Sequence, residues 1–169
     1  MKQIAVVLAS LLFAACASTP KPASQAVEKG APPIPSVTTA TVSTADLESK
    51  KLTAEIQNLQ QQSIYFELDK SIIGPEYRDV LQKQADFIKA HKNDIVTIQG
   101  NCDERGSAEY NLALGQRRAG AAQKNLELLG VPAQQINTIS FGSEKPRLTC
   151  HEEKCWKENR RDDFIHTFD

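Results

Sequence analysis

The sequence predicts an α+β domain in which two helices pack on one face of a four-stranded mixed sheet. The prediction rests on residues 63–169, where short apolar runs typical of strands alternate with longer stretches whose apolar residues recur at helical spacing. Strands that are joined through helices need crossover connections, so at least one pair of strands must be parallel. The chain has 169 residues, and after a leader and a linker there is room for one domain of roughly 100 residues.

The N-terminus has the pattern of a signal peptide over residues 1–15. Lys2 provides a positive charge, residues 4–13 form an apolar run, and small residues precede Cys16. Lipoprotein signal peptidase cuts this pattern, so we expect an acylated Cys16 that anchors the chain in a lipid bilayer through several acyl chains. Ala17 stands where an aspartate commonly signals retention in the inner membrane, which favours the outer membrane. Ordinary cleavage after Ala17 is the alternative.

Two further segments precede the domain. Residues 16–44 are rich in Pro, Ala, Ser and Thr and lack the apolar content of a core, so they predict a flexible linker that could extend about 90 Å. Residues 45–62 predict a linker helix with Leu52, Ile56 and Leu59 on one side. So thin an apolar stripe fits a frayed extension of the linker as well as a partner-binding element.

The first strand and the first helix of the domain follow. Residues 64–68 form an apolar run of strand length, and Pro75 suits the first position of a helix that ends near Asn93. The expected buried stripe of this helix is Tyr77, Leu81, Ala85 and Ile88.

A second strand, a polar turn and a long helix form the most informative stretch. The strand, residues 95–98, runs to Gly100, and Ser107 can cap the helix by accepting a hydrogen bond from a free backbone N–H. Gly130 and Pro132 stand where a helix ends. The expected buried stripe comprises Ala108, Leu112, Gly115, Ala119, Ala122, Leu126 and Leu129.

The rest of the chain predicts two more strands. Residues 136–141 form the third strand, which Gly142 ends, and residues 142–155 form a polar loop. A short helical turn at 156–160 and a last strand at 162–168 complete the domain.

Two charged residues in the informative stretch suggest a binding site. Asp103 lies in the turn, and Arg118 lies on the helix beside the apolar stripe, with its side chain leaning toward the turn. A carboxylate and a guanidinium facing one pocket suit a zwitterion, because the acid can take an ammonium group and the arginine can bind a carboxylate with two hydrogen bonds. On spacing alone, a structural salt bridge between the two, or two solvated charges, is the better interpretation.

The same stretch closely resembles the signature of OmpA-like peptidoglycan-binding domains, and among them the peptidoglycan-associated lipoproteins. The resemblance covers about residues 63–165, and its motifs are Asp-Glu-Arg-Gly at 103–106, Glu-Tyr-Asn at 109–111, Leu-Gly-Gln-Arg-Arg-Ala at 114–119, Tyr-Phe-Glu-Leu-Asp-Lys at 65–70 and Asn-Arg-Arg at 159–161. Several spaced motifs in the right order are far more specific than one short pattern.

The resemblance implies a fold, a site and a function. It implies the order β-α-β-α-β-β, and it implies that Asp103 and Arg118 hold the diaminopimelate of the peptidoglycan stem peptide, with Asp69 bordering the ligand and Asn111 and Arg160 on the same face. It also implies a lipoprotein that joins the outer membrane to peptidoglycan without covalent bonds and contacts TolB, a periplasmic protein of the Tol cell-division system. An OmpA-like lipoprotein outside that system, with a structural role, is the alternative.

The three accessory residues each have a structural interpretation as well. Asp69 could form an Asx turn, Asn111 could bond on the helix surface, and Arg160 could pair with Asp162 or Asp163.

Four further residues lie in or next to the turn that contains Asp103. Asn101 replaces the histidine that the family usually has, which puts the bracing of the turn in question, and Cys102 replaces an alanine or threonine and is expected to be a small buried thiol. Glu104 and Arg105 are expected to be solvated charges.

Two of the four cysteines flank a short loop. Cys150 and Cys155 are five positions apart, and in an oxidising compartment a disulfide is favoured. The alternative is a metal site that adds His151, with or without His166, which would suit a metal-dependent cell-wall hydrolase. Zinc sites usually show shorter cysteine spacings or a second ligand pair, so this alternative is weak.

Composition excludes other classes of function. The formal net charge is −1, so no basic surface for nucleic acid is expected. The three histidines are not placed in a nucleophile–base arrangement, and no phosphate-binding loop occurs. We therefore expect a non-catalytic binding protein without a cofactor or a metal.

Overall fold

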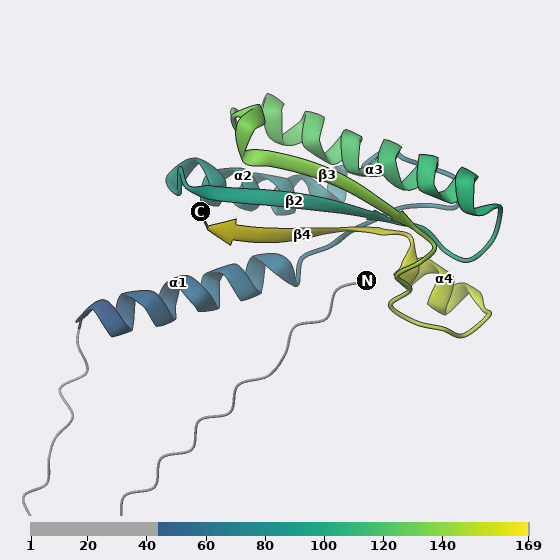
Figure 1. The fold of residues 1–169 in the computed structure, drawn as a ribbon, viewed down its shortest axis with the longest axis horizontal. Coiled ribbons are helices and arrows are strands. Elements are labelled where there is room, and N and C mark those ends of the chain that lie inside the picture. The colour runs from purple at the N-terminus through teal and green to yellow at the C-terminus, as the bar shows by residue number, and fades with distance from the viewer. Residues whose placement is uncertain (1–43, 169) are drawn as a thin grey trace, which may run out of the picture. The chain divides into compact units, whose positions relative to one another are not determined.

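The computed structural model describes residues 44–168, and its main feature is a four-stranded sheet in the order β1-β4-β2-β3. The strands are β1 (Ile64–Tyr65), β2 (Asp94–Asn101), β3 (Ile136–Gly142) and β4 (Arg161–Phe168). Figure 1 shows β2 between β3, to which it is parallel, and β4, to which it is antiparallel. The sheet is therefore mixed, which confirms the predicted α+β class.

Two helices supply the layer that covers the sheet. They are α2 (Arg78–Ala90), which follows the 3-10 turn η1 (Pro75–Tyr77), and α3 (Ala108–Leu128), which lies against β2 and β3 (Figure 1). The crossover that joins β2 to β3 passes through α3, as a parallel pair requires. The other helical elements are α1 (Thr44–Gln60), η2 (Ala133–Gln135) and α4 (Glu153–Asn159).

The core lies between this helical layer and the sheet. Its buried residues are Ile64, Phe66, Leu81, Ala85, Ile88, Val96, Ile98, Ala119, Ala122, Leu126, Val131, Ile136 and Phe164. Val96 and Ile98 alternate with half-exposed residues along β2, the pattern of a strand with one face on a core. Burial of these side chains from water supplies the main stabilisation of the domain.

A pair of glycines brings α3 unusually close to β2. A Cβ atom on Gly100 would collide with the backbone carbonyl of Gly115, and a Cβ on Gly115 would meet the hydroxyl of Ser140. The N-terminal half of α3 therefore lies directly over the end of β2, from which the turn with Asp103 departs. This close approach fixes the distance between the turn and the helix.

The short strand β1 is held by side chains as well as by its ladder. Arg147 donates to the Ser63 hydroxyl at 2.9 Å, to Asp163 at 2.8 Å and to the Tyr65 hydroxyl at 2.6 Å. Ser63 in turn donates to Asp163 at 2.7 Å. We call these four residues the Arg147 cluster; it ties β1 to β4 from the sheet face opposite the core.

The helix α1 contacts the rest of the domain at its end. Leu59 is its one buried residue, and the side chain of Gln84 donates to the Leu59 carbonyl at 2.9 Å. Gln84 also accepts from His166, whose other ring nitrogen bonds Asp94, so His166 belongs to a buried structural group. None of the helices in residues 44–168 combines the length and apolar composition needed to cross a bilayer.

Several sequence expectations need correction. The first strand was expected at 64–68 but ends at Tyr65; one more backbone hydrogen bond in the same register, from Phe66 to the carbonyl of Arg160, follows it. The first helix of the domain was expected to end near Asn93, but it corresponds to α2, which ends at Ala90. Leu112 is 53% exposed, although it was expected in the buried stripe of α3.

The stripe is shifted because the first turns of α3 face the end of the sheet rather than the apolar core. There the inward positions are Asn111, Leu114 and Arg118, and the apolar stripe begins only at Ala119. The signal peptide predicted at 1–15, acylation of Cys16 and nearly all of the linker at 16–44 lie outside the described residues.

Candidate functional site

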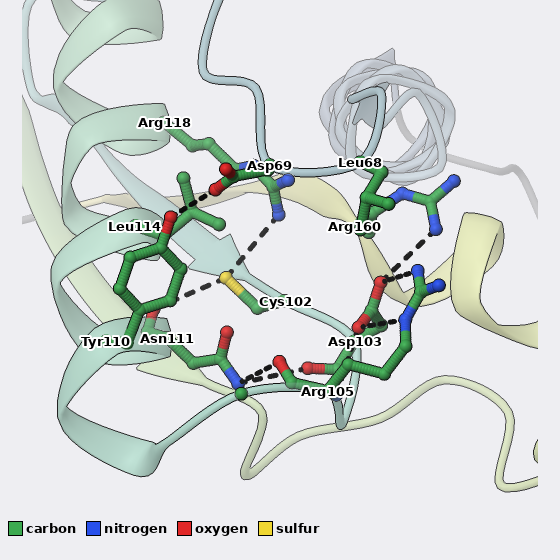
Figure 2. A pocket seen from close by; sticks show the side chains of 11 residues that line it. Leu68, Asp69, Cys102, Asp103, Arg105, Tyr110, Asn111, Leu114, Arg118 and Arg160 are labelled. Carbon is green, nitrogen blue, oxygen red and sulfur yellow. Dashed lines mark hydrogen bonds and ion pairs between the residues drawn. The ribbon is translucent and has the colours of Figure 1, made fainter.

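A pocket of about 310 Å³ opens where β2 ends and α3 begins (Figure 2). All five binding residues that the sequence suggested line it: Asp69, Asp103, Asn111, Arg118 and Arg160. They come from the β1–α2 loop, the β2–α3 turn, the first half of α3 and the junction between α4 and β4. The remaining lining residues are Leu68, Cys102, Arg105, Gly106, Tyr110 and Leu114.

The β2–α3 turn positions Asp103. Gly106 has a φ of 101°, which a side chain would disfavour, and Ser107 then caps α3 by accepting from the backbone N–H of Tyr110. Asn111 donates to the carbonyls of Asp103 and Arg105 at 3.3 and 3.0 Å. The cap and the Asn111 amide together hold the turn against the helix.

The guanidinium of Arg118 is the most buried charge of the pocket, with 0% of the residue exposed. It donates to the carbonyls of Lys70 and Asn101, each at 2.8 Å, and to that of Glu67 at 3.3 Å. A fourth hydrogen bond reaches the Cys102 sulfur. Within residues 44–168, no carboxylate forms a salt bridge with it. Arg118 is therefore held in place without having its charge neutralised by an ion pair.

Asp103 pairs with arginines other than Arg118. It is 4% exposed, and its oxygens accept from Arg105 and from Arg160, the latter at 3.2 Å. Burial by itself would raise the pKa of Asp103, but the hydrogen bonds and charges of these arginines outweigh it and lower that pKa. Both interpretations based on spacing alone, a salt bridge between Asp103 and Arg118 or two solvated charges, are therefore wrong.

Arg160 has a different set of partners from those expected. It donates to the Phe66 carbonyl at 3.0 Å and to Glu153 at 2.6 Å as well as to Asp103, and forms no hydrogen bond with Asp162 or Asp163. Asp162 lies on the core face of β4, where both of its carboxylate oxygens are buried without a hydrogen-bond partner. Burial raises the pKa of Asp162 well above its usual range, although the nearby charge of Arg118 opposes the shift.

Asp69 forms part of the pocket rim. Its backbone has a φ of 59°, in the left-handed region that aspartate tolerates better than most residues. Its carboxylate accepts a hydrogen bond from the hydroxyl of Tyr110, which ties the β1–α2 loop to α3. Figure 2 shows Tyr110 and Asp69 on one side of the pocket and Asp103 with Arg105 and Arg160 on the other.

Comparison with known proteins assigns the chain to a family. Residues 65–160 match the model of the OmpA family. The chain belongs to the OmpA family. The domain is 46% identical over 98 residues to the peptidoglycan-associated lipoprotein of Brucella melitensis, and the match spans 58% of each chain. It is 45% identical over 108 residues to that of Pasteurella multocida, over 63% of this chain and 72% of the relative.

Solved structures agree with the assignment. The crystal structure of the peptidoglycan-associated lipoprotein from Burkholderia pseudomallei is 44% identical, has a TM-score of 0.62, and matches 63% of this chain and 90% of its own. The C-terminal domain of Helicobacter pylori MotB, 21% identical with a TM-score of 0.60 over 64% of this chain and 85% of its own, shares the fold. The lipoprotein relatives are named for their association with peptidoglycan.

Two residues of this OmpA-family turn depart from the pattern described above. Asn101 donates through its side chain to the carbonyl of Gln99 at 2.9 Å, and its side-chain oxygen is buried without a partner. Its backbone carbonyl, however, accepts from Arg118, so the main chain carries the contact to the pocket. Cys102 is buried, its thiol donates to the Asn111 carbonyl, and burial raises its pKa.

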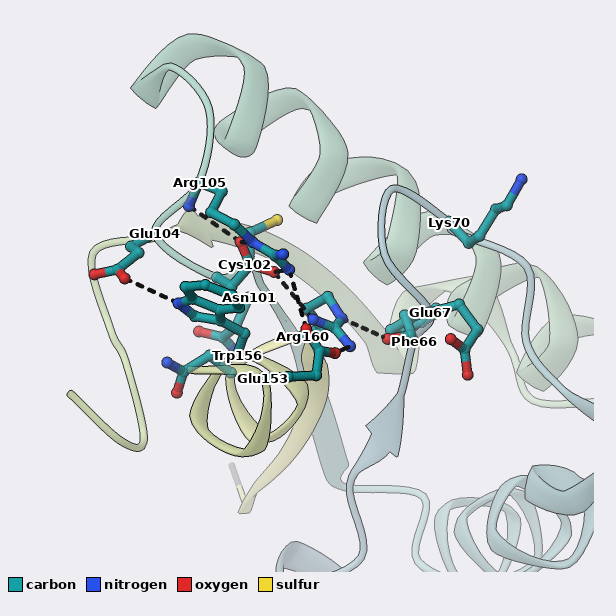
Figure 3. A network of polar contacts seen from close by, with 12 residues as sticks. Phe66, Glu67, Lys70, Asn101, Cys102, Glu104, Arg105, Glu153, Trp156 and Arg160 are labelled. Carbon is teal, nitrogen blue, oxygen red and sulfur yellow. Dashed lines mark hydrogen bonds and ion pairs between the residues drawn. The ribbon is translucent and has the colours of Figure 1, made fainter. Parts of the chain in front are cut away.

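Arg105 is not the solvated charge that the sequence suggested, whereas Glu104 is exposed as expected but has partners of its own. Arg105 pairs with Asp103 and lies over the ring of Trp156, with 4.1 Å from the guanidinium carbon to the ring centroid. Glu104 accepts from the indole N–H of Trp156 at 2.9 Å and contacts a ring nitrogen of His151 (Figure 3). The turn is thus braced on its outer side by the segment that contains α4.

That segment is closed by a disulfide between Cys150 and Cys155. Two cysteines joined in this way do not offer thiolates to a metal, and His166 is buried elsewhere with Asp94 and Gln84. Among the described residues there is no group of three or more potential metal ligands. The metal-site interpretation is therefore wrong for this loop.

Sequence reasoning missed three residues that shape the site. The pairing of Arg105 with Asp103 could have been predicted, because Arg105 follows Asp103 by two residues. At this spacing both the side chain and the backbone N–H can reach the carboxylate. Tyr110 and Trp156 act across 41 and 52 residues of sequence, respectively, and no local pattern indicates such contacts.

Proposed function

We propose that the domain binds peptidoglycan without covalent bonds, by taking the diaminopimelate of the stem peptide into the pocket. The observation that carries this proposal is the buried guanidinium of Arg118, which lines the pocket and has no carboxylate partner among the described residues. A buried cation without an ion pair is costly unless an anion comes to it. A carboxylate that enters the pocket would supply that anion.

Diaminopimelate offers the matching groups. Its distal end carries an ammonium and a carboxylate on one carbon, and the pocket presents Arg118 on one wall and Asp103 on another. The carboxylate would be bound by Arg118 and the ammonium by Asp103, while Asp69 and Asn111 border the same space. The names of the relatives, peptidoglycan-associated lipoproteins, support this choice of ligand.

The test measures binding of the full-length chain to purified peptidoglycan by co-sedimentation. Asp103→Ala and Arg118→Ala should each weaken binding at least ten-fold, because each removes a charge-assisted pair from a buried site. Arg78→Ala is the matched control, since Arg78 is an exposed arginine on α2 that does not line the pocket. Undiminished binding by both pocket variants would overturn the assignment of the site.

The proposal extends to the location of the chain. We propose an outer-membrane lipoprotein anchored through acylated Cys16, whose domain reaches the wall through the linker at 16–44. Individual affinity would be modest, and many copies on one wall would act together. Metabolic labelling with a palmitate analogue, compared between the wild type and Cys16→Ser, tests the anchor; a label on both proteins would contradict it.

Membership of the Tol system rests on the resemblance alone and is part of the same proposal. It predicts that TolB co-purifies with the wild-type chain. Failure to recover TolB while binding to peptidoglycan persists would leave an OmpA-family lipoprotein outside that system.

A further inference from the structure

Every acceptor position of Asp103 is already occupied. A carboxylate can accept about four hydrogen bonds. One oxygen accepts from the backbone N–H of Arg105 at 3.1 Å and from its Nε at 3.0 Å. The other accepts from Nη2 of Arg105 at 2.6 Å and from Nη1 of Arg160 at 3.2 Å. An ammonium group can therefore reach Asp103 only by displacing one of these donors.

Arg160 is poorly suited to leave. Its side chain is 4% exposed, and it is fixed at the same time by the Phe66 carbonyl and by Glu153. Arg105 has a side chain that is 33% exposed, and it supplies two of the four hydrogen bonds through its guanidinium. Partly exposed ion pairs are weak because water competes for both groups. Arg105 is therefore the donor that yields.

A second position for the Arg105 guanidinium is already built. It lies 4.1 Å from the centroid of the Trp156 ring, and its Nη2 is 3.8 Å from a carboxylate oxygen of Glu153. A small rotation can transfer it from Asp103 to Glu153 while it stays over the aromatic face, where a cation is attracted. Figure 3 shows Arg105, Trp156 and Glu153 together on the outer side of the turn.

We propose that Arg105 is an internal ligand of the pocket, which occupies the ammonium position on Asp103 in the free domain and is displaced by the ammonium of the incoming ligand. This inference rests on the proposed function of the same site. It assigns selectivity to Arg118 rather than to Arg105. A lone cation would exchange one ion pair of Asp103 for another, whereas a zwitterion also gives Arg118 the carboxylate that it lacks.

Binding of two defined peptides to the full-length chain tests the inference. The probes are L-Ala-γ-D-Glu-meso-diaminopimelate and the same peptide with L-lysine at the third position, titrated calorimetrically. Arg105→Ala and Arg105→Gln should bind the diaminopimelate peptide about five-fold more tightly than the wild type, the factor expected for one partly exposed ion pair. Both should keep the discrimination against the lysine peptide, because the ammonium of either peptide no longer has to displace Arg105, while Arg78→Ala should match the wild type.

The single tryptophan of the chain provides a second readout. Trp156 is the only tryptophan, so its emission reports the position of Arg105 without interference. The diaminopimelate peptide should change this emission in the wild type and leave it unchanged in Arg105→Gln, although both proteins bind.

The outcomes separate this inference from the proposed function. Equal or weaker binding by Arg105→Gln would overturn the displacement of Arg105. If Arg105→Ala disturbs the turn, the result for Arg105→Gln is the deciding one. If Asp103→Ala and Arg118→Ala bind the peptide as well as the wild type, the proposed site itself fails. If those two variants lose binding while Arg105→Gln shows no gain, only the inference about Arg105 fails.

Discussion

Replacing Asp162 by asparagine should stabilise the domain at neutral pH. Asp162 and Phe164 are two residues apart on β4 and so lie on its core face, and Asp162 is wholly buried with no partner for either carboxylate oxygen. Because burial raises its pKa, its contribution to stability is fully present below the ordinary aspartate pKa. That contribution is lost as the pH rises toward the folded-state pKa.

The size of the effect follows from the cost of burying a carboxyl group whose oxygens have no hydrogen-bond partner. A buried, unsatisfied polar group costs about 1–3 kcal/mol, and a charged one costs more. Asparagine removes the part of this cost that comes from the charge, while the lack of hydrogen-bond partners is common to both side chains. We therefore expect Asp162→Asn to increase the free energy of unfolding by about 1–3 kcal/mol at pH 7, and by less at pH 4.

Urea unfolding of the wild type and the variant at the two pH values is the assay. The neighbouring residue Asp163 is the matched control, because it accepts from Ser63, Arg147 and Arg161 and should lose stability when changed to asparagine. A loss of stability in Asp162→Asn at pH 7 would refute the reasoning. It would show that the buried carboxylate is ionised and serves Arg118 as a counter-charge.

Three further predictions concern stability. Changing Cys150 and Cys155 together to serine should lower the free energy of unfolding by about 2 kcal/mol, as loop closure over five residues predicts; denaturant curves that coincide with those of the reduced wild type would support this, and no loss would contradict it. Gly100→Ala should lower it by ~2 kcal/mol or more, because the new methyl group meets the Gly115 carbonyl; an unchanged midpoint would mean that α3 can move away freely. The lowered pKa of Asp103 means that its stabilisation is present above the unfolded pKa and lost as the pH falls below about 4. Asp103→Asn should remove that part of the acid dependence, and an identical acid profile would show that the arginine pairs add nothing.

The layered fold was predictable because it follows from periodicity. The spacing of Leu81, Ala85 and Ile88 correctly indicated the buried face of α2, and the apolar run at 95–98 correctly placed β2. These patterns record which side of an element meets water, and that information is local. The two-residue length of β1 was not predictable, because it depends on how far β4, almost 100 residues later, runs alongside it.

The pocket was predictable only in outline. A turn followed by a helix necessarily brings Asp103 and Arg118 into one region, because the side chain of a helical residue leans toward the N-terminus. Their partners depend on distant segments: Arg118 binds carbonyls of the β1–α2 loop, and Asp103 binds Arg160 between α4 and β4. The polar inward face of α3 was missed for the same reason, since an apolar stripe alone does not show where a helix passes from the core to a pocket.

The short strand β1 has a mechanical consequence. A pull on the chain ahead of the domain passes through α1 to Ser63 and enters the sheet at β1, which pairs with β4 at only two residues. After the hydrogen bond between Gln84 and Leu59, the next connections to bear that load are the hydrogen bond between Ser63 and Asp163 and the three bonds of Arg147. Resistance to a pull from the N-terminal side would then depend on the Arg147 cluster, whereas resistance to heat or urea depends on the apolar core. Mechanical strength and thermodynamic stability can therefore be changed separately.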